Sequence, residues 1–209
     1  MVSANSPEEN PADGDGDGRY LAETVKRSVK ILVVGAFGVG KTTLIGSVSE
    51  IAPLRTEETM TTASVGVDDL AGMEGKTTTT VAMDFGRITL SPHLVLYLFG
   101  TPGQRRFWDL WEGLAEGAVG ALVLVDTRRL ERGFEVLDHL ETHSPALPFA
   151  VAVNHFPDSR HHDAEELSEA LDLPPGTPVA DCDARERSSA AKALITLVQH
   201  ALSLQKVPS

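Results

Sequence analysis

Apolar runs of strand length alternate with stretches of helical periodicity from residue 29 onward. The predicted strands are Lys30–Val34, Val81–Leu90, Leu94–Phe99, Ala118–Val125, Phe149–Val153 and Thr177–Ala180. The predicted helices are Lys41–Glu50, Arg105–Ala115, Leu130–Thr142, Asp163–Leu171 and Glu186–Leu204. Such an alternation is typical of a mostly parallel sheet that helices cover on both faces. The pattern therefore predicts an α/β fold with a mostly parallel six-stranded sheet.

One connection shows that this sheet is not wholly parallel. Only Ser91-Pro92-His93 separates Val81–Leu90 from Leu94–Phe99. Three residues leave no room for a crossover helix, so these two strands are predicted to be antiparallel neighbours. The preceding stretch, Ile51–Thr80, has little periodicity and many Thr, Gly and acidic residues. It is predicted to be a long loop of the kind that often carries function.

The length of 209 residues suits one domain with an appendage. Residues 1–27 are polar and acidic, so we expect a disordered tail there and a single domain over residues 28–209. The run from Asp13 to Gly18 opens like a calcium-binding loop. The twelfth position of such a loop needs a bidentate carboxylate, and here it is Thr24. A solvated acidic tail is therefore the favoured interpretation.

Charge and composition exclude several classes of protein. The net charge of −12 disfavours nucleic acid as a ligand, because proteins that bind it use clustered Lys and Arg. No segment approaches the ~18 uncharged apolar residues of a membrane span, and the N-terminus has no hydrophobic signal-peptide stretch. The single cysteine, Cys182, excludes an intrachain disulfide and fits a reducing compartment. We expect a soluble, cytoplasmic protein.

A glycine-rich motif directly follows the first predicted strand. The segment from Gly35 to Thr42 matches G-x-x-x-x-G-K-[ST] at every fixed position and leads into a helix. Its glycines let backbone N–H groups converge on phosphates, and the helix N-terminus attracts the anion. Lys41 adds a charge for binding and catalysis, and the Thr42 hydroxyl is the predicted Mg²⁺ ligand. The predicted triphosphate site comprises Gly35, Phe37, Gly38, Val39, Gly40, Lys41, Thr42 and Thr43.

A second block, after the antiparallel strand pair, carries a specific resemblance. Phe99-Gly100-Thr101-Pro102-Gly103-Gln104 resembles the D-T-A-G-Q motif of Ras-like small GTPases. The resemblance covers about Val29–Leu204 and implies a P-loop NTPase with a Ras-like three-layer sandwich, its sheet containing one antiparallel strand. It also implies that the Gly103 amide senses the γ-phosphate and that Gln104 is catalytic, because it orients the attacking water.

The metal site departs from that family. The family has an aspartate that supports Mg²⁺ at the position of Gly100. Asp84, on the antiparallel partner strand, is the candidate to compensate, and a strand-surface aspartate without a role is the alternative. The family also has a switch threonine that binds Mg²⁺ and the γ-phosphate just before its second strand. By resemblance this residue is Thr80, with Thr79 as the reserve.

Phe37 is a second departure, because Ras has glycine at this position. A bulky ring there would obstruct an arginine supplied by a partner over the γ-phosphate. We therefore expect slow hydrolysis or an arginine from the chain itself. Arg55 and Lys76 on the long loop are candidate donors, and solvated loop charges are the alternative for both.

Two further loops resemble the base-binding motifs of the same family. Asn154-His155-Phe156-Pro157-Asp158 resembles N-K-x-D, with His155 in place of lysine and Asp158 one position late. Cys182-Asp183-Ala184-Arg185 resembles S-A-K, in which the alanine amide binds the guanine O6. The resemblance thus implies GTP or GDP with Mg²⁺ as ligands. It assigns guanine recognition to Asn154, His155, Asp158, Asp183, Ala184 and Arg185.

Thr101-Pro102-Gly103-Gln104 and Cys182-Asp183-Ala184-Arg185 look most like the bacterial gliding-motility and conservon GTPases. That resemblance implies a cytoplasmic switch that works with a roadblock-type regulator and a sensor-kinase-like membrane protein. Trp108 falls off an apolar helical stripe and is interpreted as a partner contact, since Trp is enriched at binding hot spots. The stripe consists of Phe107, Leu110, Trp111 and Leu114.

Three functions fit these patterns. A GTP-hydrolysing switch is the preferred hypothesis. A nucleotide-dependent binding module with little hydrolysis is the first alternative, because of Gly100 and Phe37. An ATP-using P-loop kinase or ATPase is the second, because the base motifs are incomplete.

Overall fold

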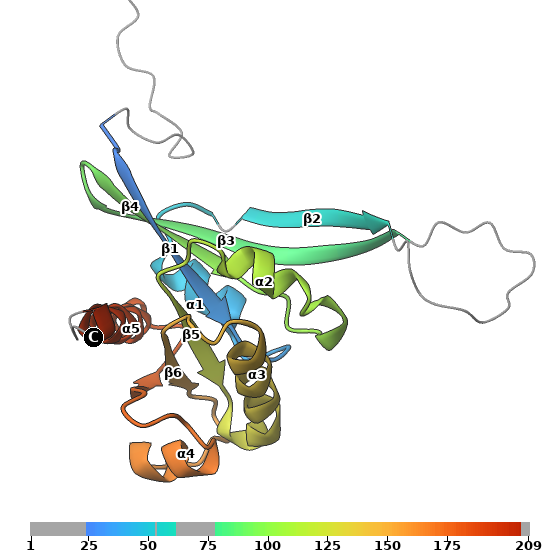
Figure 1. The fold of residues 1–209 in the computed structure, drawn as a ribbon, viewed down its shortest axis with the longest axis vertical. Coiled ribbons are helices and arrows are strands. Elements are labelled where there is room, and N and C mark those ends of the chain that lie inside the picture. The colour runs from blue at the N-terminus through green and yellow to red at the C-terminus, as the bar shows by residue number, and fades with distance from the viewer. Residues whose placement is uncertain (1–23, 53, 62–77, 206–209) are drawn as a thin grey trace, which may run out of the picture.

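The computed structural model describes residues 24–52, 54–61 and 78–205. A single seven-stranded sheet with helices packed against it forms this part of the chain (Figure 1). The strands are β1 (Arg27–Val34), β2 (Leu54–Thr61), β3 (Thr78–Ser91), β4 (Leu94–Gly100), β5 (Gly120–Val125), β6 (Phe149–Asn154) and β7 (Val179–Cys182). The α-helices are α1 (Lys41–Val48), α2 (Leu110–Ala115), α3 (Leu130–His143), α4 (Ala164–Ala170) and α5 (Arg187–Gln205). Two 3₁₀ turns, η1 (Arg105–Phe107) and η2 (Thr127–Arg129), precede α2 and α3.

Strand directions confirm the predicted α/β class. The order across the sheet is β2-β3-β4-β1-β5-β6-β7. All pairings from β4 through β1 and β5 to β7 are parallel, whereas β3 is antiparallel to both of its neighbours. β3 is therefore the one strand that opposes the others, and the short turn at Ser91-Pro92-His93 joins it to β4 as expected.

The predicted loop Ile51–Thr80 was wrong in part, because it contains β2 and the start of β3. β2 pairs with β3 from Leu54 opposite Phe85 to Thr61 opposite Thr78. The segment shows no alternation of apolar and polar residues, so periodicity could not reveal it. An edge strand needs only one neighbour for its backbone, and here β3 provides it. All six predicted strands are present, and β2 adds a seventh.

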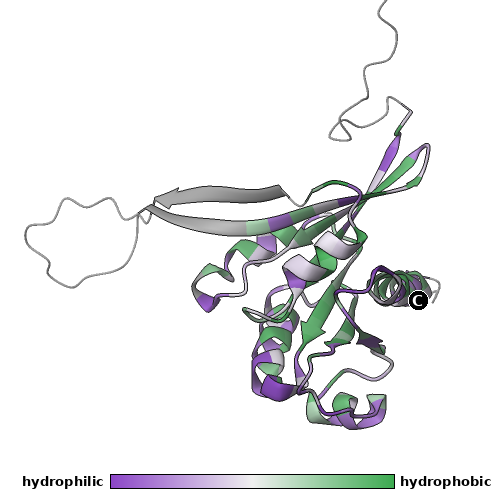
Figure 2. Ribbon diagram, turned by 180° about the vertical axis from the view of Figure 1, so that it is seen from behind, coloured by the Kyte–Doolittle hydropathy of each residue, from purple (hydrophilic) through white to green (hydrophobic). Residues whose placement is uncertain are grey.

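The core consists of two apolar layers, one on each face of the sheet. Ile31 and Val33 of β1 pack with α1 and α5, whereas Leu32 and Val34 pack with Trp111 and α3 on the other face. β5 is buried along its whole length, which explains its continuous apolar run. Figure 2 shows the hydrophobic strands in the middle of the molecule. The predicted three-layer sandwich is confirmed.

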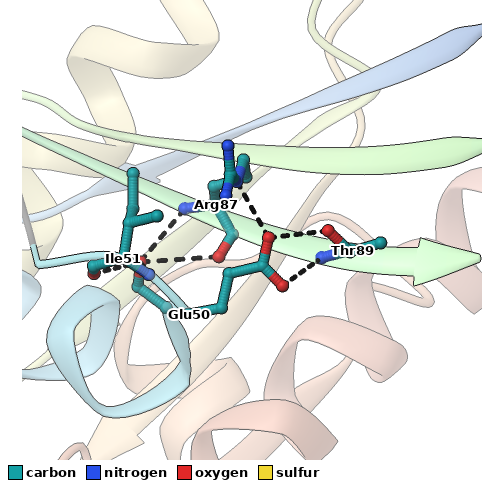
Figure 3. A network of polar contacts seen from close by, with 5 residues as sticks. Glu50, Ile51, Arg87 and Thr89 are labelled. Carbon is teal, nitrogen blue, oxygen red and sulfur yellow. Dashed lines mark hydrogen bonds and ion pairs between the residues drawn. The ribbon is translucent and has the colours of Figure 1, made fainter. Parts of the chain in front are cut away.

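A polar network ties the end of α1 to β3 (Figure 3). The Glu50 carboxylate accepts hydrogen bonds from Arg87 Nε at 2.8 Å and from Thr89 N and Oγ1 at 3.0 and 2.6 Å. Ser49 Oγ accepts from the backbone N–H groups of Arg87 and Ile51. Burial raises the pKa of Glu50, but the hydrogen bonds from Thr89 and Arg87 outweigh it and hold this pKa below its usual value. The network fixes α1 against the strand that carries Asp84.

The predicted helix Arg105–Ala115 is interrupted in the structure. Its first turn is 3₁₀, and α2 begins only at Leu110. Trp108 therefore does not follow the helical stripe. Its ring packs 5.2 Å from the Trp111 ring and 4.8 Å from the His139 ring of α3, measured between centroids. The ring is half-buried against the core on this side of the sheet, and the role of Trp108 as a partner contact stays a prediction.

The N-terminal segment is described only from residue 24. Residues 1–23, which include the Asp13–Gly18 run, lie outside the described residues. Lys26 N and Arg27 N donate to His93 O at 3.1 and 3.0 Å, and β1 begins one residue before the predicted domain start at 28. Within residues 24–52, 54–61 and 78–205, no helix is long and apolar enough to cross a membrane.

Candidate nucleotide-binding site

The phosphate-binding loop connects the carboxyl end of β1 to the N-terminus of α1. Gly35, Gly38 and Gly40 have positive φ angles, which L side chains rarely adopt. α1 begins at Lys41, so the N–H groups of its first turn have no partner within the helix and face the loop. The Lys41 ammonium donates to the carbonyls of Gly35 at 2.7 Å and Ala36 at 2.9 Å. The loop thus collects an ammonium group and unpaired amides at one helix terminus, the arrangement that binds phosphates.

Lys41 is buried, with 8% of its surface exposed. Burial lowers the pKa of Lys41 from 10.5 to about 8, and the nearby Asp84 carboxylate opposes the shift. Phosphate oxygens beside the ammonium would raise this pKa again, because opposite charge favours the protonated form.

Proton uptake on nucleotide binding follows from this pKa. Below pH 8 Lys41 is already protonated, so triphosphate affinity will hardly depend on its titration. Above pH 8 the Lys41 amine must take up a proton when the triphosphate binds. Triphosphate affinity will therefore fall by up to about tenfold per pH unit. Titration calorimetry in buffers of different ionisation enthalpy will show uptake of close to one proton at pH 9 and much less at pH 7. Equal proton uptake at both values would contradict the role of Lys41.

Asp84 lies beside the predicted metal ligand Thr42. The Thr42 hydroxyl donates to Asp84 Oδ2 at 2.5 Å. Asp84 on β3 pairs directly with Gly100 on β4. A Cβ at residue 100 would lie 3.0 Å from Asp84 Cβ and 3.4 Å from Asp84 Oδ2. A carboxylate on the adjacent strand thus lies at the same level of the sheet as Gly100.

The residues around Thr42 fit a Mg²⁺ ion that also binds phosphate. The described residues contain no group of three or more His, Cys, Asp or Glu side chains that could hold a metal by themselves. Mg²⁺ at phosphate sites uses one or two protein oxygens, and water and phosphate provide the others. Thr42 and Asp84 supply oxygens of the required kind.

Gly103 approaches the phosphate-binding loop so closely that only glycine fits. A Cβ at this position would lie 2.6 Å from Phe37 N and 2.8 Å from the Lys41 ammonium nitrogen. The neighbouring Thr101 N donates to Val33 O at 3.0 Å, and Trp111 Nε1 donates to Pro102 O at 3.2 Å. These bonds hold the Thr-Pro-Gly segment against the loop. Gln104 follows at the exposed start of η1.

The switch threonines and the candidate arginine donor lie on the β2–β3 pair. Thr80 and Thr79 are strand residues opposite Thr59 and Met60, whereas the prediction placed them at the end of a loop. Arg55 pairs with Asp84 through the backbone ladder. The side chains of Thr79, Thr80 and Arg55, and Lys76 as a whole, lie outside the described part of the chain. Their roles stay predictions.

Asn154 connects the phosphate-binding loop to the second base loop. Its Nδ2 donates to Val39 O at 2.9 Å, and its Oδ1 accepts from Ala184 N at 2.9 Å. The side chain is buried at the carboxyl end of β6. The structure therefore brings together three predicted site residues that are far apart in the sequence. The Ala184 amide, predicted to bind the guanine O6, donates to Asn154 in this arrangement.

The remaining predicted base residues form two groups. His155 Nε2 lies 3.2 Å from Asp181 Oδ1. Arg185 binds the Asp183 carboxylate through Nε at 2.9 Å and Nη2 at 2.7 Å. Hydrogen bonds from Arg185 lower the pKa of Asp183 to about 2, so this carboxylate is ionised at neutral pH. Asp158 is exposed on the loop after β6.

Arg128, which was not among the predicted site residues, contacts this loop. Arg128 binds both oxygens of Asp126, and its guanidinium lies 3.9 Å from the centroid of the Phe156 ring. Phe156 is the third residue of the segment that resembles N-K-x-D. The Asp-Thr-Arg sequence after β5 was the available signal, because Asp at the first position of a turn commonly accepts from the backbone two residues later. Arg128 N indeed donates to Asp126 Oδ1.

Comparison with known proteins identifies the family. The family model described as a conserved hypothetical ATP-binding protein matches residues 33–204. The chain belongs to this family. An uncharacterized protein of Methanocaldococcus jannaschii is 30% identical over 131 residues, which are 62% of this chain and 71% of that protein. The G domain of the T. maritima FeoB iron transporter is similar in structure, with a TM-score of 0.57, 16% identity, and coverage of 84% of this chain and 99% of that domain.

This member of the conserved hypothetical ATP-binding family has the P-loop NTPase fold in its G-domain form. The structural likeness at 16% identity shows the fold alone. The family match spans every predicted site residue from Gly35 to Arg185. The protein is accordingly a nucleotide-binding P-loop NTPase.

Proposed function

We propose that the protein is a molecular switch that binds GTP with Mg²⁺ and hydrolyses it slowly to GDP. One observation carries the proposal: Lys41, Thr42, Asp84 and Gly103 converge on the N-terminus of α1 from three separate segments. Convergence of an ammonium, a hydroxyl, a carboxylate and a close backbone approach is what a Mg²⁺–triphosphate needs.

Each residue has a distinct part in this function. The amides of the phosphate-binding loop and Lys41 bind the β- and γ-phosphates, and Lys41 also stabilises charge that develops on them. Thr42 and Asp84 would hold Mg²⁺, with Thr80 as a further ligand, and the bound metal would neutralise phosphate charge. The Gly103 amide would donate a hydrogen bond to the γ-phosphate, so that the position of the following segment depends on whether this phosphate is present. Gln104, exposed at the start of η1, would orient the attacking water.

Guanine selection is proposed for the two loops that Asn154 connects. Asn154 holds Val39 and Ala184 in place. His155 would stack on the base in place of the usual lysine stem, and Asp158 would accept hydrogen bonds from the guanine edge. Asp183 and Arg185 form an ion pair within the second loop, and the Ala184 amide would bind O6 after exchanging its partner.

Replacing Asp158 with asparagine tests this selection. Base donors left without an acceptor cost ~1–3 kcal/mol, so GTP affinity should fall by roughly ten- to a hundredfold. Relative preference should move toward XTP, because the amide can donate to the additional carbonyl of xanthine. Displacement of labelled GTP by GTP, GDP, ATP and XTP measures both effects, with the exposed Asp172→Asn as the matched control. An unchanged GTP-to-XTP ratio would move base recognition to another residue.

An ATP-using P-loop protein is the alternative that the family description favours. Pro157 occupies the position of the guanine-binding aspartate, which is consistent with a different base. The same competition experiment decides between the two on the unmodified protein. We expect GTP and GDP to displace labelled GTP at much lower concentration than ATP does, and equal displacement by ATP would replace the proposal with this alternative. Single-turnover phosphate release then separates an enzyme from a binding module that does not hydrolyse.

A role in a bacterial signalling assembly is proposed from the Thr101-Pro102-Gly103-Gln104 and Cys182-Asp183-Ala184-Arg185 blocks. Their resemblance to conservon and gliding-motility GTPases supports a cytoplasmic location and partners of two kinds. These are a roadblock-type regulator and a sensor-kinase-like membrane protein, through which the switch would reach the inner face of the membrane. Binding of purified partners to the GTP-loaded form and not to the GDP-loaded form would support this assignment.

A further inference from the structure

Phe37 stands on the rim of the phosphate-binding loop with 68% of its surface exposed. Two hollows in the protein surface flank it, and Ala36, Phe37 and Arg132 line both of them. The first hollow extends to the end of β5 and is also lined by Asp126, Arg128 and Arg129. The second extends toward the segment after β4 and is also lined by Gly103, Arg105, Trp108 and Glu135. Arg132, in the first turn of α3, is therefore next to the loop on both sides of the phenyl ring.

Most of the neighbouring arginines are engaged by other groups. Arg128 is held by Asp126 and the Phe156 ring, and Arg105 binds both carboxylate oxygens of Glu135. Arg129 lines only the first hollow. Arg132 is exposed and has no hydrogen bond or ion pair to any residue that the structure describes. Its guanidinium is free to turn toward an anion without breaking an existing contact.

The second hollow leads from Arg132 to the position expected for the γ-phosphate. Gly103 marks this position, since a Cβ there would approach both Phe37 N and the Lys41 ammonium. The exposed Phe37 ring stands on this loop, where we expect it to obstruct an arginine inserted by a partner. An arginine from α3 instead approaches along the loop, beside the phenyl ring. We propose that Arg132 is the arginine of this chain that contacts the γ-phosphate during hydrolysis, an inference that rests on the function proposed above.

The reaction that Arg132 would assist conserves charge and protons. The water oxygen forms a bond to the γ-phosphorus, and the bond between that phosphorus and the β–γ bridging oxygen breaks. The electron pair stays on the bridging oxygen, so GTP⁴⁻ and H₂O give GDP³⁻ and H₂PO₄⁻. Negative charge moves onto the bridging oxygen and the γ-phosphate oxygens. Arg132 keeps its proton throughout and donates hydrogen bonds to these oxygens. These hydrogen bonds are strongest in the transition state, and they therefore lower the barrier to hydrolysis.

Single-turnover hydrolysis by the full chain tests the proposal. Arg132→Ala should slow phosphate release at least tenfold and leave the affinities for GTP and GDP within about threefold. Arg132→Lys should recover only part of the rate, because lysine lacks the planar fork of donors. Arg27→Ala, at the exposed far end of β1, is the matched control and should hydrolyse at the wild-type rate. Gln104→Leu supplies the reference for a hydrolysis defect with intact binding.

A binding measurement separates a catalytic contact from a structural one. The wild-type protein with GDP and aluminium fluoride should form a stable complex without a partner, and Arg132→Ala should lose this complex while it still binds GDP. A wild-type rate together with an intact fluoride complex in Arg132→Ala would overturn the assignment. A larger loss in Arg129→Ala than in Arg132→Ala would also overturn it and transfer the role to Arg129. Failure of the wild-type protein to hydrolyse GTP would instead reject the proposed function.

Discussion

Replacing Lys41 with alanine will reduce GTP affinity at least a thousandfold, which corresponds to about 4 kcal/mol. Hydrogen bonds from an ammonium to phosphate oxygens are charge-assisted, and they are strongest where water is excluded. Lys41 is buried and donates to the loop carbonyls, so its ammonium lies where such bonds are strong. Fluorescence titration with labelled GTP measures the loss directly.

The fold should survive this substitution. Alanine leaves the Gly35 and Ala36 carbonyls without their donor, which costs stability, but it also removes a charge that burial disfavours. The two effects oppose each other, so thermal unfolding should move by only a few degrees. Lys192→Ala, on the exposed side of α5, is the matched control and should bind GTP normally. Retention of wild-type affinity by Lys41→Ala would reject the phosphate site as described.

Replacing Asp84 with alanine will raise the Mg²⁺ concentration needed for half-maximal hydrolysis at least a hundredfold, or about 2.8 kcal/mol. Asp84 is the acidic side chain bonded to Thr42, and Mg²⁺ at a phosphate site has few protein ligands to lose. Binding of GTP in the presence of a chelator should change little. Single-turnover hydrolysis measured at increasing Mg²⁺ concentrations gives the concentration needed for the half-maximal rate.

Returning the carboxylate to the adjacent strand provides the control. In the double variant Asp84→Ala with Gly100→Asp, the carboxylate of residue 84 is exchanged for one on β4, the position that has it in Ras-like proteins. The alanine Cβ stays 3.0 Å from the new Cβ, so the two strands must also move apart slightly. This variant should recover part of the Mg²⁺ dependence, although the nearby Ile45 side chain must move. An unchanged magnesium requirement in Asp84→Ala would return Asp84 to the status of a strand-surface residue.

Features encoded in short stretches of sequence could be predicted. The buried strands and the helices are visible because their periods follow from backbone geometry over a few residues. The phosphate-binding loop is visible because backbone conformation and phosphate chemistry together demand glycine, lysine and threonine at fixed spacing. The position of Asp84 opposite Gly100 could be predicted because two strands joined by a three-residue turn must be neighbours, and its role as a substitute for the missing carboxylate stays a prediction.

Other features depend on contacts between distant segments. β2 is a strand only because it pairs with β3. Trp108 packs against His139 of α3 because the 3₁₀ turn η1 takes the place of a helical turn. The bond from Asn154 to Ala184 joins residues 30 positions apart. Arg132 lines a hollow beside the phosphate-binding loop because α3 packs against the same face of the sheet as Val34 at the end of β1. Local patterns determined the elements and the chemistry of the loop. Tertiary packing decided which side chains surround the phosphate site, because sheet order and helix placement, and not sequence distance, set their separations.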